Sequence, residues 1–211
     1  MNASSIIDAD GHVVEPDSVF AERLPARHRD LAPRAVREGD RFHFRSGETT
    51  SFSLQAKPES LAAPRQHGER SGAGEARTGA FDPAGRLADM DLDQIAQAVI
   101  FPTYGLMIQQ VADAEAQIAL CRAINDWLAD YCRHSPTRLF GVGVLPQTSA
   151  GAAFAEAKRC LETLGFRGVW RRPERIAGTP ALHDPSYEPL WSYLEEADRP
   201  LALHPGLNGL V

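Results

Sequence analysis

The sequence predicts a parallel α/β fold. Five short apolar runs alternate with helix-like runs, and each apolar run ends at polar, glycine or proline residues. Strands that are apolar on both faces are typical of buried parallel sheets, in which helices join neighbouring strands. The last four predicted strand ends lie roughly 30 to 40 residues apart, which is the length of one strand–helix unit.

The individual elements follow from this alternation. Strands are expected at residues 5–9, 98–101, 139–145, 168–170 and 201–203. Helices are expected at residues 83–97, 107–134, 149–164 and 185–197, where apolar residues recur at three- and four-residue steps. Gly165 is expected to end the third helix, and Asp184 is expected to cap the fourth.

The stretch between the first two strands is longer than one such unit. Residues 41–45 alternate and meet Ser46-Gly47, which predicts a small hairpin. Residues 55–80 are polar and rich in glycine, alanine and arginine, which predicts a long loop. We therefore expect one domain over residues 1–211, with an irregular lid or insertion at about residues 40–80.

Composition limits the classes of partner. The 211 residues carry a formal net charge of −6 and have a pI near 5.6, which disfavours nucleic acid and anionic membranes. The three cysteines have no Cys-x-x-Cys spacing, so a disulfide framework or a zinc ribbon is not expected. The first residues lack the pattern of a signal peptide, and no apolar run is long enough to span a membrane. We expect a cytoplasmic protein that acts on a small molecule.

Two strand ends carry residues that bind metals. Asp10-Gly11-His12 follows the first strand, and side chains two positions apart on a strand share a face. His204 follows the fifth strand. The alternatives are a loop aspartate beside a solvent-facing histidine, and a buried histidine bonded to a backbone carbonyl. Together Asp10, His12 and His204 predict a site for Zn²⁺ or Mn²⁺.

Other residues near the strand ends are candidates for binding substrate. Phe101 and Tyr104 could wall a pocket, Arg172 could hold a substrate carboxylate, and His183 could reach the same rim. A purely structural role is an equal alternative for each of them. The chain has neither a nucleotide-binding glycine motif nor a Gly-x-Ser-x-Gly motif.

Several blocks of the sequence, in order, resemble the amidohydrolase-related metalloenzymes (amidohydrolase family 2). The resemblance is to the branch that includes aminocarboxymuconate semialdehyde decarboxylase, and it covers nearly the whole chain except residues 40–80. The blocks are IIDADGHVVEPDSVF, RLADMDLDQIAQAVIFPTYG, AINDWLADYCRHSPTRLFGVGVLP and GFRGVWRRPERIAGTPALHDPSYEPLWSYLEEADRPLALHPG.

This resemblance implies a metal-dependent (β/α)8 TIM barrel of which about the first five βα units are present. Asp10 and His12 match the ligand pair of the first strand, and His204 matches the ligand of the fifth, with Zn²⁺ expected in preference to Mn²⁺. The family's catalytic aspartate follows the eighth strand, so no catalytic residue is assigned in this chain. We expect the chain to be the N-terminal part of a barrel of about 300 residues.

The resemblance also implies an activity. The expected reaction is hydrolysis or non-oxidative decarboxylation of a small carboxylated or aromatic substrate. The alternative is an inactive truncated fragment or a non-catalytic assembly subunit, which would associate as a homo-oligomer through the open edges of its sheet.

Overall fold

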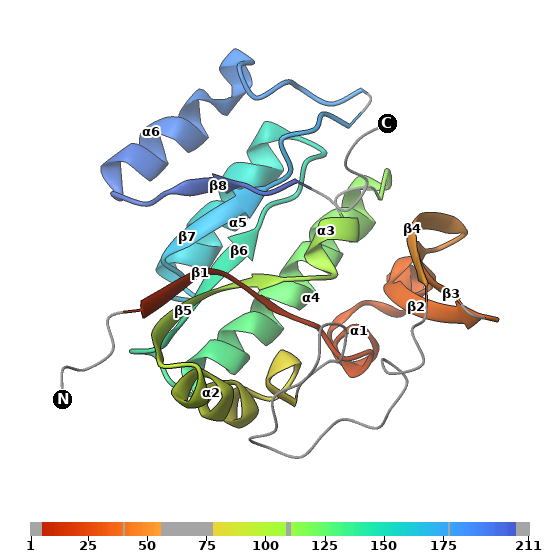
Figure 1. Cartoon of the computed structure of the whole chain (residues 1–211). Helices are drawn as coiled ribbons and strands as arrows, with labels where there is room; N and C mark the ends of the chain where they lie inside the picture. Colours follow the sequence, from red (N-terminus) through yellow and green to blue (C-terminus); the bar gives the residue numbers. More distant parts are fainter. Residues whose placement is uncertain (1–5, 40, 56–77, 109–110, 177, 206–211) are drawn as a thin grey trace.

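The computed structural model describes residues 6–39, 41–55, 78–108, 111–176 and 178–205. Two sheets are present in this part of the chain (Figure 1). The strands are β1 (Ile6–Val13), β2 (Pro33–Glu38), β3 (Arg41–Ser46), β4 (Thr49–Gln55), β5 (Ile95–Pro102), β6 (Leu139–Val144), β7 (Gly168–Arg171) and β8 (Leu201–Leu203).

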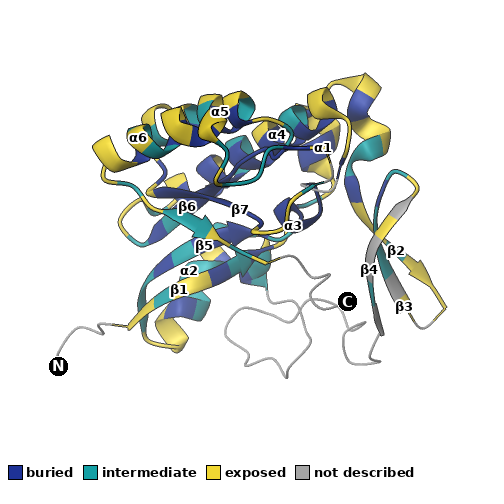
Figure 2. Cartoon of the chain, turned by 90° about the horizontal axis from the view of Figure 1, so that it is seen from above, coloured by how far each residue is buried: buried dark blue, intermediate teal, exposed yellow. Residues whose placement is uncertain are grey.

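The larger sheet confirms the predicted parallel architecture. Its strand order is β1-β5-β6-β7-β8, and every neighbouring pair is parallel. The five strands correspond to the five predicted ones. Three helices cover one face of this sheet, namely α4 (Ala114–Arg133), α5 (Ala150–Glu162) and α6 (Glu188–Glu196) (Figure 2). The structure therefore has the strand–helix alternation of a barrel that is partly present.

Three α-helices begin at capping side chains, each of which accepts a hydrogen bond from a backbone N–H. Asp113 caps α4, Ser149 caps α5, and Asp82 caps α2 (Pro83–Leu92). The predicted cap at Asp184 is confirmed, although it begins the short 3-10 helix η4 (Pro185–Tyr187) that leads into α6. Gly165 has a left-handed backbone just after α5, as expected for a residue that ends a helix.

Two predicted helices extend beyond the helices of the structure. The helix expected at residues 83–97 ends at Leu92, because Gln94 turns into a left-handed conformation and β5 begins at Ile95. The helix expected at 107–134 is divided into α3 (Gly105–Ile108) and α4, whose capping Asp113 is extended. Apolar spacing alone did not locate these breaks, since apolar residues recur at similar steps before and after each of them.

The first strand is less buried than predicted. Ile6 and Ile7 at the start of β1 are more than half exposed. In the described part of the chain β1 is an edge strand that pairs only with β5. An edge strand has a neighbouring strand on one side only, so fewer residues surround Ile6 and Ile7 at the start of β1.

The insertion after β1 is more regular at its start than predicted. Helix α1 (Ser18–Arg23) and the 3-10 helix η1 (Ala26–Leu31) lead into an antiparallel sheet of order β2-β3-β4. The hairpin expected at residues 41–47 is therefore confirmed. The rest of the predicted lid, residues 56–77, lies outside the described residues, and a short 3-10 helix η3 (Thr78–Ala80) precedes α2.

The core forms between the large sheet and its helices. Leu128, Ile100 and Val169 are among its fully buried members. All three cysteines are free thiols and buried. No helix in the described ranges is both long and apolar enough to cross a membrane.

Candidate metal centre

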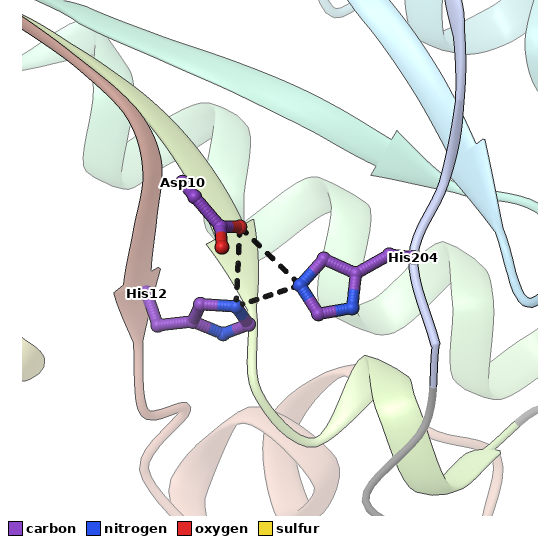
Figure 3. Close-up of side chains that lie close together, drawn as sticks. All are labelled: Asp10, His12 and His204. Carbon is purple, nitrogen blue, oxygen red and sulfur yellow. Dashed lines mark hydrogen bonds and ion pairs between the residues drawn. The ribbon is translucent and has the colours of Figure 1, made fainter. Parts of the chain in front are cut away.

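Asp10, His12 and His204 come together near the carboxyl ends of β1 and β8, the two outer strands of the large sheet (Figure 3). Each offers a ligand atom, and these three atoms all lie within 4.8 Å of one another. Nε2 of His12 lies 3.1 Å from Nε2 of His204, and the Asp10 carboxylate lies 3.3 Å from Nε2 of His204 and 3.8 Å from Nε2 of His12. The structure thus assembles the trio that the sequence predicted from separate strand ends.

A bulge in β1 presents its two members of the trio. Asp8 pairs with Ala98 and Gly11 pairs with Ile100, so β1 contains one more residue than β5 between these pairs. Gly11 suits this close approach, because a Cβ atom there would lie 2.7 Å from the Asp8 carboxylate and 3.1 Å from a backbone carbonyl of β5. The chain can therefore pass close to β5 while Asp10 and His12 both turn toward His204 (Figure 3).

Each histidine is held through its other ring nitrogen. Nδ1 of His12 lies 3.2 Å from the Thr103 hydroxyl, and Nδ1 of His204 lies 2.9 Å from the carbonyl oxygen of Pro205. Histidines that bind metals usually have such a partner on the nitrogen that does not coordinate. Both rings are consequently oriented so that their Nε2 atoms face the Asp10 carboxylate.

The electrostatics favour uncharged imidazole at His12. Burial lowers the pKa of His12 from 6.5, the nearby His204 lowers it further, and the Asp10 carboxylate opposes this shift. A neutral imidazole has the lone pair that a cation needs. One carboxylate oxygen and two imidazole nitrogens form a donor set that can hold a divalent cation.

Aromatic rings surround the two histidines. Phe101 of β5 stacks on His12 with ring centroids 6.0 Å apart and lies 5.2 Å from the ring of His204. Trp170 of β7 meets His204 edge-on at 5.6 Å. The indole nitrogen of Trp170 is buried and has no hydrogen-bond partner among the described residues. The trio therefore lies against an apolar wall, in which Phe101 was a predicted candidate and Trp170 was not.

Glu15 is a second residue that the sequence prediction missed. Its carboxylate is buried and accepts hydrogen bonds from the backbone N–H groups of Tyr104 (2.9 Å) and Gly105 (3.2 Å). Burial raises the pKa of Glu15 to about 7, although these hydrogen bonds oppose the shift. Glu15 lies three positions after His12, but its burial could not be inferred from that spacing.

Three of the predicted substrate-binding residues are not brought to the trio by any described contact. Tyr104 is buried between the rings of Phe20 and Phe44. The Arg172 guanidinium pairs with Glu174 at 3.0 Å. His183 is exposed in the loop before η4. Phe101 is the one substrate-binding candidate in contact with the ligand residues.

A carboxylate and two histidines at the carboxyl ends of strands in a parallel α/β barrel are typical of a class of barrel metalloenzymes. The chain belongs to the amidohydrolase family, whose profile matches residues 7–210. This finding confirms the family that the sequence blocks resembled.

Two curated relatives fall in the predicted branch. The chain is 34% identical over 124 residues to a γ-resorcylate decarboxylase of Rhizobium radiobacter, a match that covers 57% of this chain and 38% of the relative. It is 26% identical over 125 residues to the 2-amino-3-carboxymuconate-6-semialdehyde decarboxylase of Dictyostelium discoideum, covering 59% and 34% respectively. The matches thus span little more than a third of the relatives.

Two solved structures share the fold. An amidohydrolase from Mycobacterium avium subsp. paratuberculosis superposes with a TM-score of 0.71 at 22% identity, covering 99% of this chain and 60% of its own. A dihydroxybenzoic acid decarboxylase from Polaromonas, with bound manganese and the inhibitor 2-nitroresorcinol, superposes with a TM-score of 0.61 at 20% identity, covering 97% and 50%. The described sheet therefore corresponds to about half of such a fold.

Proposed function

We propose that the protein carrying this chain is a metal-dependent, non-oxidative decarboxylase of hydroxylated aromatic carboxylates. The observation that carries the proposal is the trio of Asp10, His12 and His204, whose ligand atoms converge beside the rings of Phe101 and Trp170. The names of the curated relatives support a decarboxylase, because γ-resorcylate and aminocarboxymuconate semialdehyde are both carboxylated substrates.

The residues present fit a divalent cation. The donor atoms are close enough to share one ion, and both histidines are held so that Nε2 is turned toward it. Nitrogen donors favour Zn²⁺, whereas the Polaromonas relative supports Mn²⁺. A bound divalent cation supplies Lewis acidity, which stabilises negative charge that develops on the substrate.

The side chains around the trio suit a flat, oxygen-rich ligand. Phe101 and Trp170 place two aromatic rings beside the trio, and the ring of Phe101, which is 6% exposed, can pack against a substrate ring. The unpaired indole N–H of Trp170 can donate to a hydroxyl or carboxylate oxygen of that ring, which would remove the cost of a buried donor without a partner. We keep Arg172 as a candidate for binding the substrate carboxylate, provided that it exchanges its contact with Glu174.

The metal centre is tested by measuring Mn and Zn content after the purified protein is saturated with each ion and dialysed. We expect one ion per chain in the wild type and a large loss in Asp10→Ala, His12→Ala and His204→Ala. His134→Ala is the matched control, because His134 is an exposed histidine at the end of α4. Metal content unchanged by all three substitutions in the trio would rule out the assignment.

The reaction is tested by separate assays on the metal-loaded protein. Release of CO₂ from γ-resorcylate would support the decarboxylase. Cleavage of aryl esters or amides without CO₂ release would instead support a hydrolase, the other reaction predicted for the family.

A further inference from the structure

We infer that Arg86 of α2 is a positioning residue for the metal ligand His12. Nη2 of its guanidinium donates a hydrogen bond to the backbone carbonyl of His12, whose side chain is a member of the trio. The inference rests on the proposed metal centre and goes beyond it, because it concerns a residue that holds a ligand through its backbone.

The bulge in β1 makes the direction of His12 depend on contacts after the bulge. The pairing of β1 with β5 is irregular between Asp8 and Gly11, so His12 is only the second residue of the resumed ladder. The ladder holds β1 on one side alone, because β1 is an edge strand in the described part of the chain. Contacts from the open side would therefore fix the part of the backbone that β5 leaves free.

The η3–α2 segment makes these contacts on the open side of β1. The carbonyl of Val13 accepts a hydrogen bond from the N–H of Thr103, which follows β5, at 3.0 Å. Backbone groups of successive strand residues point to opposite sides, so the His12 carbonyl and the Val14 N–H face away from β5. The Val14 N–H donates to the carbonyl of Ala80 at 2.7 Å, and the His12 carbonyl accepts from the guanidinium. The segment thus takes the place of a neighbouring strand at this end of β1.

Arg86 extends from a helix that is itself anchored. Tyr131 of α4 is buried, and its hydroxyl donates to the carbonyl of Gly79 in η3 at 2.7 Å. A Cβ atom at Gly79 would lie 2.7 Å from Cα of Arg86, so the glycine allows η3 to lie against α2. Asp82 caps α2 by accepting from the N–H of Gly85 at 2.7 Å. The guanidinium therefore starts from a fixed position.

A guanidinium suits the contact with a backbone carbonyl. It is always charged, and a hydrogen bond from a charged donor is stronger than one between neutral groups. The Nε atom of Arg86 is buried and makes no hydrogen bond with the described residues, so the contact with His12 is made at the end of the side chain. A peptide unit is planar, so holding the His12 carbonyl restricts the ψ angle of His12. The His12 ring thereby keeps the direction that turns Nε2 toward Asp10.

Arg138 provides a matched control for Arg86. Its Nε donates to the carbonyl of Ala96 at 3.0 Å and its Nη2 to the carbonyl of Ile95 at 2.9 Å, at the amino end of β5. Both arginines thus hold backbone carbonyls of a strand of the same sheet, but only Arg86 holds that of a residue in the trio. Substitution of either arginine should lower stability, whereas only substitution of Arg86 should lower metal affinity.

The test measures Zn²⁺ affinity by isothermal titration at a temperature at which circular dichroism shows each variant to be folded. We expect Arg86→Met and Arg86→Gln to weaken binding about 10-fold or more. Arg138→Met and Arg138→Gln should bind with wild-type affinity. The visible absorption spectrum of the Co²⁺-loaded protein, which reports the arrangement of the ligands, should change in the Arg86 variants alone. The Gln variant carries the test if the Met variant does not fold.

Two results would overturn the inference alone, provided that His12→Ala lowers zinc affinity. One is wild-type affinity in a folded Arg86→Met or Arg86→Gln protein. The other is an equal loss of affinity in the Arg138 variants, since the loss would then follow from a weakened sheet. A wild-type protein that binds no zinc, or a His12→Ala protein that binds it normally, would overturn the proposed metal centre and this inference with it.

Discussion

The Nε2 atoms of His12 and His204 lie 3.1 Å apart, although 192 positions separate these residues in the sequence. His12 is in β1 and His204 follows β8, and these strands are the two ends of the described parallel sheet. The sheet therefore curls until its two ends share one site. A ligand that binds both histidines would hold this curvature in place.

Zinc is accordingly expected to stabilise the folded protein. Zn²⁺ at about 100 times its dissociation constant contributes about 2.7 kcal/mol, which raises the melting temperature of a chain of this size by roughly 5 to 10 °C. Differential scanning calorimetry with and without Zn²⁺ measures this shift. His204→Ala should abolish it and His134→Ala should retain it, whereas an equal shift in His204→Ala would place the stabilising ion elsewhere.

Glu15 is expected to make stability depend on pH in a defined direction. Its pKa is raised from 4.5 to about 7 in the folded protein, so the folded state binds the proton more tightly than the unfolded state in this window. The contribution of protonated Glu15 to the free energy of unfolding is present below pH 4.5 and is lost as the pH rises through 7.

The substitution Glu15→Gln removes this titration. The unfolding free energy of the wild type minus that of the variant should fall by about 3 kcal/mol between pH 4.5 and pH 8. Urea unfolding at both pH values measures it, with the exposed Glu115→Gln as control. A difference that stays constant with pH would contradict the buried, proton-binding state of Glu15.

Trp170→Phe tests the unpaired indole donor. The substitution keeps an aromatic ring beside His204 and removes the N–H, so the affinity for γ-resorcylate should fall about 2- to 10-fold. Isothermal titration of the zinc-loaded protein measures the affinity. Trp191→Phe is the control, since Trp191 stacks on Tyr187 away from the trio. Unchanged affinity in Trp170→Phe would show that the indole N–H does not contact the ligand.

Gly105→Ala tests how closely α3 packs on Trp170. A Cβ atom at Gly105 would lie 2.9 Å from the Trp170 ring and 3.1 Å from Pro102, so this variant should lose about 1 to 3 kcal/mol of stability. Gly151→Ala is the matched control, because nothing lies within 4 Å of a Cβ atom at that position of α5. There the same change should stabilise the protein by up to about 1 kcal/mol, as measured by urea unfolding. Similar changes in the free energy of unfolding for Gly105→Ala and Gly151→Ala would contradict the close contact between α3 and Trp170.

The predicted strands were recovered more reliably than the ends of the helices. A buried parallel strand is a short apolar run that stops at polar or glycine residues, and the runs at residues 139–145 and 201–203 have this form. The end of α2 depends on the left-handed turn at Gln94, which no glycine or proline marks. The exposure of Ile6 and Ile7 depends on the number of neighbours of β1, which is a property of the sheet.

The candidate site was likewise predictable only in part from the sequence. The sequence by itself determined that Asp10 and His12 share a face, because alternation along a strand is local, and that His204 stands at a strand end. Only the tertiary structure decided that these three residues meet, that Thr103 and Trp170 lie beside them, and that Tyr104 packs into the core instead. These contacts depend on the curvature of the sheet and on the turn after β5, which arise from packing between segments far apart in the sequence.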